Sequence, residues 1–132
     1  MAANSDTLGS VQACIKKCEH ALREGKSCVV DNTNVDVESR KKLIELAKSQ
    51  NVQCRCFTMN VSLGQIKHNI VFRELTDSKH SKINDMVLNM LKKKYKSPSL
   101  DEGFSELVSV NIKPQFSNAE HAKLYKMYLV EK

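Results

Sequence analysis

Hydrophobic and polar residues alternate along this chain with two periods, one typical of helices and one typical of strands. A helix that ends at Gly25 is predicted by the apolar stripe Val11, Cys14, Ile15, Cys18 and Leu22. Strands are predicted at 27–31, 52–59 and 107–112, and further helices from Asp36 toward Ser49, from Ser62 to about Leu75, within 79–96 and over 119–130. This alternation favours a parallel α/β sheet, although a chain of that class rarely begins with a helix.

Length and composition indicate a single globular domain. The chain has 132 residues, of which 41% are hydrophobic and 27% are charged. No apolar run approaches the roughly 20 residues needed to cross a bilayer, so no membrane partner is expected. The five cysteines are odd in number and lack the spacing of a secreted disulfide framework, which favours a reducing compartment.

Two local patterns resemble functional motifs but have simpler structural explanations. The run Gly25-Lys26-Ser27 looks like the end of a phosphate loop, but it leaves a helix and enters a strand, whereas a phosphate loop does the reverse. We therefore interpret Gly25 as a helix C-cap. The pairs Cys14/Cys18 and Cys54/Cys56 lie among apolar residues without a Cys-x-x-Cys spacing, so we predict buried thiols and no metal site.

Positive charge is concentrated in the second half of the chain. The net charge is +6, and the segment 79–96 carries six lysines against the single acid Asp85. Its apolar residues have helical spacing, so one face of this helix is expected to pack while the other presents lysines. A solvated face and a phosphate-binding surface explain these lysines equally well at this point.

The strand predicted at 27–31 ends in an acid and is followed by two amides and a hydroxyl. Its last residue is Asp31, and Asn32, Thr33 and Asn34 follow. In parallel α/β sheets ligands bind at the carboxyl ends of strands, and in nucleotide kinases an acid there holds Mg²⁺ or organises phosphates. A second acid, Asp6, precedes the first predicted helix, where it is either a general base or an N-cap, and local sequence favours the cap.

A resemblance to a known family rests on eight short segments. They are 4–10 (NSDTLGS), 31–34 (DNTN), 54–57 (CRCF), 68–69 (HN), 72–74 (FRE), 76–78 (TDS), 85–87 (DMV) and 102–105 (EGFS). In order and spacing they resemble the kinase domain of animal bifunctional polynucleotide kinase 3′-phosphatases over nearly the whole chain. The resemblance implies one incomplete P-loop kinase-like domain over 1–132, with a three-layer αβα arrangement around a parallel sheet.

The resemblance also implies a reaction and the residues that carry it. The reaction is transfer of the ATP γ-phosphate, with Mg²⁺, to the 5′-hydroxyl end of DNA or RNA in strand-break repair. Asp6 matches the general base of the family, which accepts the hydroxyl proton as the oxygen attacks phosphorus. Asp31, Thr33 and Asn34 match the stretch that borders the phosphates, and Arg73 lies in the segment that resembles the lid over ATP.

Contacts to nucleic acid follow from the same resemblance. Arg40 matches an arginine that we assign to a substrate phosphate. The resemblance also favours contacts from Lys92, Lys93 and Lys94 to the nucleic-acid backbone. A nuclear location is implied, with mitochondrion and cytoplasm as alternatives. Repair-complex proteins would bind through domains that this chain does not contain.

Departures from the family pattern set further expectations. Ser5 and Val71 stand where the family has arginines. The central strand, the glycine-rich loop and the following helix of the family would all precede Met1. We therefore expect unpaired edges and exposed apolar faces on the strands at 27–31 and 107–112. The isolated chain is expected to be marginally stable and inactive, because the missing loop positions ATP.

Three hypotheses remain open from the sequence. The chain is the later part of a polynucleotide kinase, which is the favoured reading, or a non-catalytic nucleic-acid-binding relic, or an α/β module that binds a protein partner. A steep salt dependence of DNA binding would favour the relic over the partner-binding module.

Overall fold

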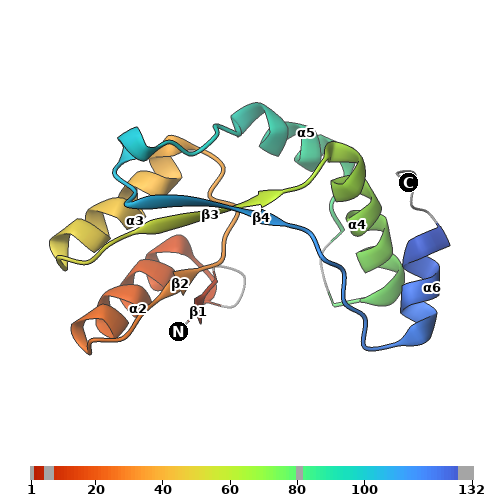
Figure 1. The fold of residues 1–132 in the computed structure, drawn as a ribbon, viewed down its shortest axis with the longest axis horizontal. Helices are drawn as coiled ribbons and strands as arrows, with labels where there is room; N and C mark the ends of the chain where they lie inside the picture. Colours follow the sequence, from red (N-terminus) through yellow and green to blue (C-terminus); the bar gives the residue numbers. More distant parts are fainter. Residues whose placement is uncertain (1, 5–7, 80–81, 128–132) are drawn as a thin grey trace. The chain divides into compact units, whose positions relative to one another are not determined.

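The structure is a computed structural model that describes residues 2–4, 8–79 and 82–127 (Figure 1). The chain forms two compact units, one comprising Met1–Cys56 and Lys93–Val108 and the other comprising Phe57–Lys92 and Ser109–Lys132. We call them unit 1 and unit 2. Helices and strands alternate over residues 2–76, helices within 85–102 follow, and a strand and a helix within 106–127 come last, which confirms the α/β class expected from the sequence.

Unit 1 begins with a parallel strand pair. Strand β1 (Ala2–Ala3) pairs in parallel with β2 (Val29–Val30), so that Ala2 lies opposite Val29. The Asp31 N–H extends the ladder by donating to the Ala3 carbonyl at 2.9 Å. The expectation that the chain begins with a helix was wrong, because a two-residue strand made of alanine carries no pattern that a sequence reading can detect.

The two helices of unit 1 begin and end where their capping residues predict. Helix α2 is Val11–Arg23 and helix α3 is Val37–Ser49, and the Asp36 side chain caps α3 by accepting from the Ser39 N–H at 2.9 Å. After α2 the N–H groups of Gly25 and Lys26 donate back to the Leu22 and Ala21 carbonyls, with Gly25 at φ +76°. This pattern is a Schellman motif, and it confirms that Gly25 is a C-cap and not part of a phosphate loop.

Small side chains form the centre of unit 1. Ala3, Cys14 and Cys18 make one buried cluster, against which Cys28 and Leu46 pack. The prediction of buried thiols is confirmed for Cys14 and Cys18, whereas the three other cysteines are partly exposed. Within the described parts of the chain no group of three or more acidic, histidine or cysteine side chains is placed to hold a metal ion.

A buried ion pair joins α3 to the short 3-10 helix η1 (Leu100–Glu102). Arg40 donates from Nε to Glu102 Oε1 at 2.9 Å and from Nη2 to Oε2 at 3.3 Å, while the two side chains are only 3% and 8% exposed. Arg40 Nη1 also donates to the Asn34 carbonyl at 2.9 Å, and Glu102 accepts from the Ser99 N–H at 2.8 Å. Arg40 therefore ties three segments of unit 1 together.

The residue after η1 has to be glycine. Gly103 adopts φ +116°, and a Cβ built there would lie 2.9 Å from Cγ2 of Ile44. Ile44 is itself buried on α3. A side chain at this position would thus meet both an unfavourable backbone conformation and a packed neighbour.

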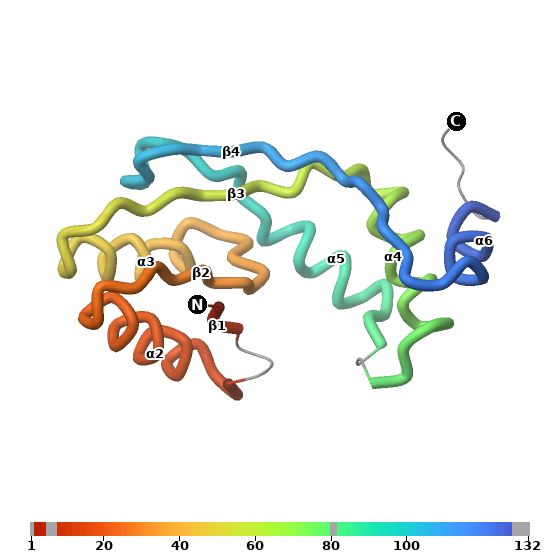
Figure 2. The backbone as a smooth tube through the Cα atoms, turned by 60° about the horizontal axis from the view of Figure 1, so that its bottom comes forward, coloured from red at the N-terminus to blue at the C-terminus, as the bar shows by residue number. Residues whose placement is uncertain are grey.

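Strands β3 (Arg55–Asn60) and β4 (Glu106–Asn111) form a second two-stranded sheet and run side by side in both views (Figure 1; Figure 2). Ser105 N–H donates to the Cys54 carbonyl, and the Asn60 and Asn111 side chains bond at 2.9 Å. The sequence offset is constant between these pairs, so the strands are parallel. Both β2 and β4 are thus paired on one edge, while apolar side chains of these strands such as Val29 and Leu107 remain 62% and 38% exposed, as expected.

Unit 2 is built around α4 (Leu63–Thr76) and α6 (Ala119–Met127), with most of α5 (Asp85–Lys94). Ser62 caps α4 by accepting from the Gln65 N–H at 3.1 Å. The Gln65 side chain donates to Asn69 Oδ1 at 2.8 Å and to Tyr125 Oη. Tyr125 is buried and packs edge-to-face on Phe72 at 5.1 Å between ring centres. No described helix is long and apolar enough to cross a membrane.

Replacing Gly103 by alanine should destabilise the chain by about 1–3 kcal/mol, because of the positive φ and the contact with Ile44. The matched control is Gly64→Ala in α4, where the nearest atom to a new Cβ is 3.9 Å away. That variant should gain about 0.5–1 kcal/mol from helix propensity. Urea denaturation of the two variants measures both effects, and equal shifts would contradict the requirement for glycine at position 103.

Acid should weaken the Arg40–Glu102 pair. The hydrogen bond from Arg40 holds the pKa of Glu102 below its ordinary value of 4.5, so the stabilisation is present above that pH and is lost as pH falls through the lowered pKa. Glu102→Gln should lower the unfolding free energy at pH 7 by about 3 kcal/mol, since it leaves a buried guanidinium without its counter-ion.

The same substitution should flatten the pH dependence of stability below pH 4.5. Glu45→Gln, which changes an exposed acid on α3, is the control and should change stability by less than about 1 kcal/mol. Urea midpoints measured from pH 7 to pH 3 test the pair; an unchanged acid sensitivity in Glu102→Gln would exclude Glu102 as its source.

Candidate functional site

The segment 31–34, which we call the DNTN loop, leaves β2 directly. Its first residue is anchored through the bond from Asp31 N–H to Ala3, and its last through the bond from Arg40 to the Asn34 carbonyl. Asn34 adopts a left-handed conformation with φ +43°, which asparagine tolerates better than most residues. Asp31 and Thr33 are exposed between these two anchors. The loop therefore presents a carboxylate and a hydroxyl to solvent on a fixed backbone.

Arg40 holds this loop from inside the protein. Its guanidinium is 3% exposed and is occupied by Glu102 and by the Asn34 carbonyl. To reach a phosphate it would have to leave both partners. The assignment of Arg40 to a substrate phosphate stays a prediction that this placement does not support; the geometry instead shows it bracing the loop.

Glu102 was not identified as a site residue from the sequence. The Ser99 side chain accepts from the Asp101 N–H at 3.2 Å, and Ser99 N–H donates to Glu102, so the two form a capping box. The spacing Ser-x-x-Glu was a signal for this capping role. Its partnership with Arg40 spans 62 positions and leaves no local trace in the sequence.

The end of the lysine-rich helix adjoins the DNTN loop. Lys96 N–H donates to the carbonyl of Val35, the residue after the loop, at 2.8 Å. Hydrogen bonds from Ser39, and then the nearby charges of Lys94 and Arg40, hold the pKa of Asp36 below its ordinary value. Lys94 therefore lies within electrostatic reach of the first turn of α3. The sequence did not predict this proximity.

All three lysines proposed to contact nucleic acid are exposed. Lys92, Lys93 and Lys94 occupy the last turn of α5, where positive charge also interacts favourably with the helix dipole. Of these, Lys93 and Lys94 belong to unit 1 together with the DNTN loop. The structure thus brings part of the predicted basic surface to the predicted phosphate site.

Neither of two further predicted site residues, Arg73 and Asp6, is among the described residues of unit 1. Arg73 lies on α4 in unit 2, where its side chain is partly exposed and its carbonyl accepts from the Asp77 N–H at 2.8 Å. Asp6, the predicted general base, lies outside the described residues, as does Ser5. The roles of Arg73 and Asp6 remain predictions from the resemblance.

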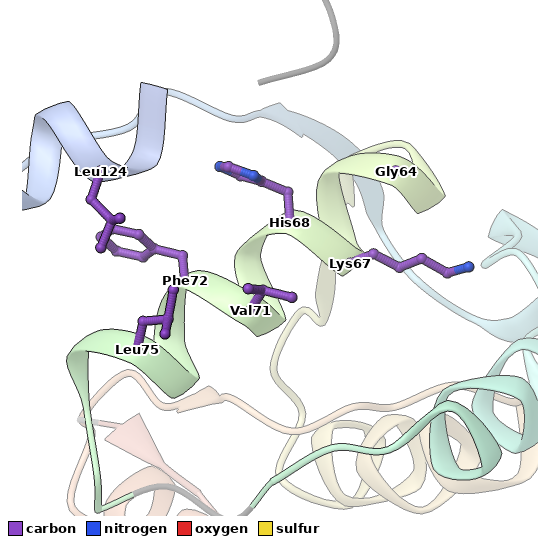
Figure 3. A pocket seen from close by; sticks show the side chains of 7 residues that line it. All are labelled: Gly64, Lys67, His68, Val71, Phe72, Leu75 and Leu124. Carbon is purple, nitrogen blue, oxygen red and sulfur yellow. The ribbon is translucent and has the colours of Figure 1, made fainter. Parts of the chain in front are cut away.

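Unit 2 contains a mostly apolar cavity of about 250 Å³ between α4 and α6 (Figure 3). It is lined by Gly64, Lys67, His68, Val71, Phe72, Leu75 and Leu124. The side chains of Phe72 and Leu124 overlap in this view, whereas Lys67 extends away from them (Figure 3). His68 Nε2 is buried and has no hydrogen-bond partner within the described part of the chain, and its ring packs edge-on against Tyr125. Sequence reasoning did not identify this cavity.

Comparison with known proteins agrees with the motifs. A bifunctional polynucleotide phosphatase/kinase of Schizosaccharomyces pombe is 34% identical over 110 residues, which is 83% of this chain and 27% of that protein. A protein of Acanthamoeba polyphaga mimivirus, whose name gives the same pair of activities as provisional, is 33% identical over 109 residues, or 81% of this chain and 26% of its own length. The chain therefore spans about a quarter of the length of these curated relatives.

A family model described as an AAA domain matches residues 2–98. This match covers well over half of the chain, and it includes the DNTN loop, α4 and the lysine-rich helix. The α/β architecture is the one expected of a P-loop kinase-like domain. The chain therefore belongs to the AAA domain family and is a homologue of bifunctional polynucleotide phosphatase/kinases.

Proposed function

We propose that this chain forms part of an ATP-dependent polynucleotide 5′-hydroxyl kinase and supplies one wall of its phosphate and nucleic-acid site. The observation that carries the proposal is the bond from Lys96 to Val35, which holds the basic end of α5 against the DNTN loop. Acid, hydroxyl and ammonium groups thereby share one part of unit 1. Such a grouping suits phosphoryl transfer, in which catalysis is mainly positioning and charge stabilisation.

The donor set of the DNTN loop fits Mg²⁺ and phosphate. Asp31 supplies carboxylate oxygens and Thr33 a hydroxyl, which are the hard oxygen ligands that Mg²⁺ prefers. When bound with ATP, the metal would neutralise charge on the transferring phosphate. Asp31 and Thr33 orient that group, while the Arg40 bond to Asn34 keeps the loop from shifting.

We assign the proton transfer to Asp6, following the family motif. Its carboxylate would accept the proton of the 5′-hydroxyl as that oxygen attacks the γ-phosphate. An ordinary carboxylate is basic enough, because the hydroxyl becomes acidic only as the bond to phosphorus forms. Arg73 is assigned to the ATP phosphates on the same ground.

The nucleic-acid strand is proposed to run along the exposed lysines of α5. Ammonium groups bind backbone phosphates without reading sequence, so this surface suits the ends of DNA or RNA of any sequence. On the ground of the family resemblance alone we also propose a nuclear location and a role in strand-break repair. The 132-residue polypeptide contains no glycine-rich phosphate loop, and we expect no ATP turnover from it alone.

Binding of the chain to single-stranded DNA should depend steeply on salt. With Lys92, Lys93 and Lys94 on phosphates, a plot of log affinity against log salt should have a slope of about −2. Replacing all three by glutamine should weaken binding at least about tenfold and bring the slope close to zero. Fluorescence anisotropy with a labelled 5′-hydroxyl oligonucleotide measures both quantities.

The matched control replaces three exposed lysines of α2 and α3, namely Lys16, Lys17 and Lys42, by glutamine. This variant has the same net charge as the α5 variant. An equal loss of affinity in both would show that overall charge, and not the α5 surface, binds DNA. Salt-dependent binding at α5 without any ATP chemistry in a longer polypeptide would instead support the relic hypothesis.

Asp6→Asn should abolish most phosphate transfer in a polypeptide that joins these residues to an upstream glycine-rich loop. We expect kcat to fall by about 10²–10⁴-fold, since the general base is lost, with little change in the KM for ATP. Transfer of labelled γ-phosphate to a 5′-hydroxyl oligonucleotide measures this. Glu45→Gln is the control, and a fully active Asp6→Asn enzyme would remove Asp6 from the mechanism.

A further inference from the structure

Three of the five cysteines gather beside the DNTN loop in what we call the thiol cluster: Cys14, Cys18 and Cys28. The sulfur atoms of Cys18 and Cys28 are 2.7 Å apart, and the Asn32 amide lies 4.0 Å from the sulfur of Cys14. Cys14 and Cys18 are almost completely buried, whereas Cys28 is partly exposed at the start of β2. The strand that leads into the loop thus meets α2 through a pair of thiols.

We propose that Cys18 and Cys28 are a redox modification site that closes to a reversible intramolecular disulfide in the presence of glutathione disulfide. The proposal rests on the geometry of unit 1 alone and does not depend on the kinase assignment. Within the described residues this is the one pair of sulfur atoms in hydrogen-bond contact. A small approach of the two side chains would reach the bonding distance of about 2.05 Å.

The chemistry takes two exchange steps. The Cys28 thiolate, which is the accessible one, attacks a sulfur of glutathione disulfide and releases one glutathione, leaving a mixed disulfide on Cys28. The Cys18 thiolate then attacks the sulfur of Cys28 and releases the second glutathione. Two electrons pass from the protein thiols to glutathione disulfide, and the two thiol protons end on the released glutathione molecules.

The second step should be slow at neutral pH. In the reduced protein burial, and next the hydrogen bond with Cys28, raise the pKa of Cys18 to about 12. In the mixed disulfide the contribution of the Cys28 thiol is lost, and burial still keeps the pKa of Cys18 raised. Cys18 is therefore a thiol at pH 7. The fraction of Cys18 present as the attacking thiolate rises about tenfold with each pH unit. The mixed disulfide on Cys28 should persist at pH 7 and close faster as pH rises toward 9.

Peptide mapping of the full chain tests the proposal directly. The chain is incubated with glutathione disulfide, alkylated and digested with trypsin, which places Cys14 in 1–16, Cys18 in 18–23, Cys28 in 27–40, Cys54 in 49–55 and Cys56 in 56–67. The expected product links 18–23 to 27–40 and disappears on reduction. Linkages that exclude Cys18 or Cys28, or glutathione adducts that never close at pH 9, would overturn the proposal.

Thermal unfolding gives a second readout. The disulfide closes a short loop in the unfolded chain, so the oxidised protein should melt about 10 °C above the reduced protein. Cys28→Ser, a substitution at a partly exposed position, should lose both the linked peptide and the shift, whereas Cys56→Ser should keep both. An equal shift in Cys28→Ser would show that the stabilisation comes from elsewhere.

Discussion

The ion pair between Arg40 and Glu102 is the interaction on which unit 1 depends. It is bidentate, almost fully buried, and joins residues 62 positions apart in the sequence. A buried charge is tolerated only when it is paired and hydrogen-bonded, and here the third contact of Arg40 is the carbonyl of Asn34. The energetic requirement to satisfy the guanidinium therefore also fixes the backbone at the end of the DNTN loop.

The resemblance assigns both Arg40 and the lysines of α5 to nucleic acid, but the structure gives them different surroundings. Arg40 is inside and holds the loop, while Lys92, Lys93 and Lys94 are outside and free of such a structural role. The difference follows from side-chain chemistry: the planar guanidinium can satisfy several fixed acceptors at once, whereas ammonium groups suit solvated phosphates. Of the residues that the resemblance assigns to nucleic acid, the exposed ones are therefore on α5, whereas Arg40 on α3 is buried.

Sequence reasoning predicted the helices well, because periodicity and caps are local signals. Asp36, Ser62 and Gly25 lie at helix ends as predicted. It missed β1, whose two alanines carry no strand preference, and it missed the Gln65 side chain turning to Asn69 and Tyr125. The same limit applies to the site: Asp31 follows its strand as expected, but the Arg40–Glu102 pair and the Lys96–Val35 bond join distant segments and depend on tertiary packing.

The DNTN loop is held at one end by strand pairing and apolar packing, and at the other end by a buried ion pair. At one end β2 and Asp31 rest on β1 and the thiol cluster, where small side chains let the strand and α2 approach closely. At the other end Asn34 is held by a charged pair that weakens in acid. The two anchors share no residue, since one is a backbone bond to Ala3 and the other is a bond from the Arg40 side chain. If the proposed phosphoryl transfer takes place here, it depends on positioning, so changes at either anchor would act on it through Asp31 and Thr33.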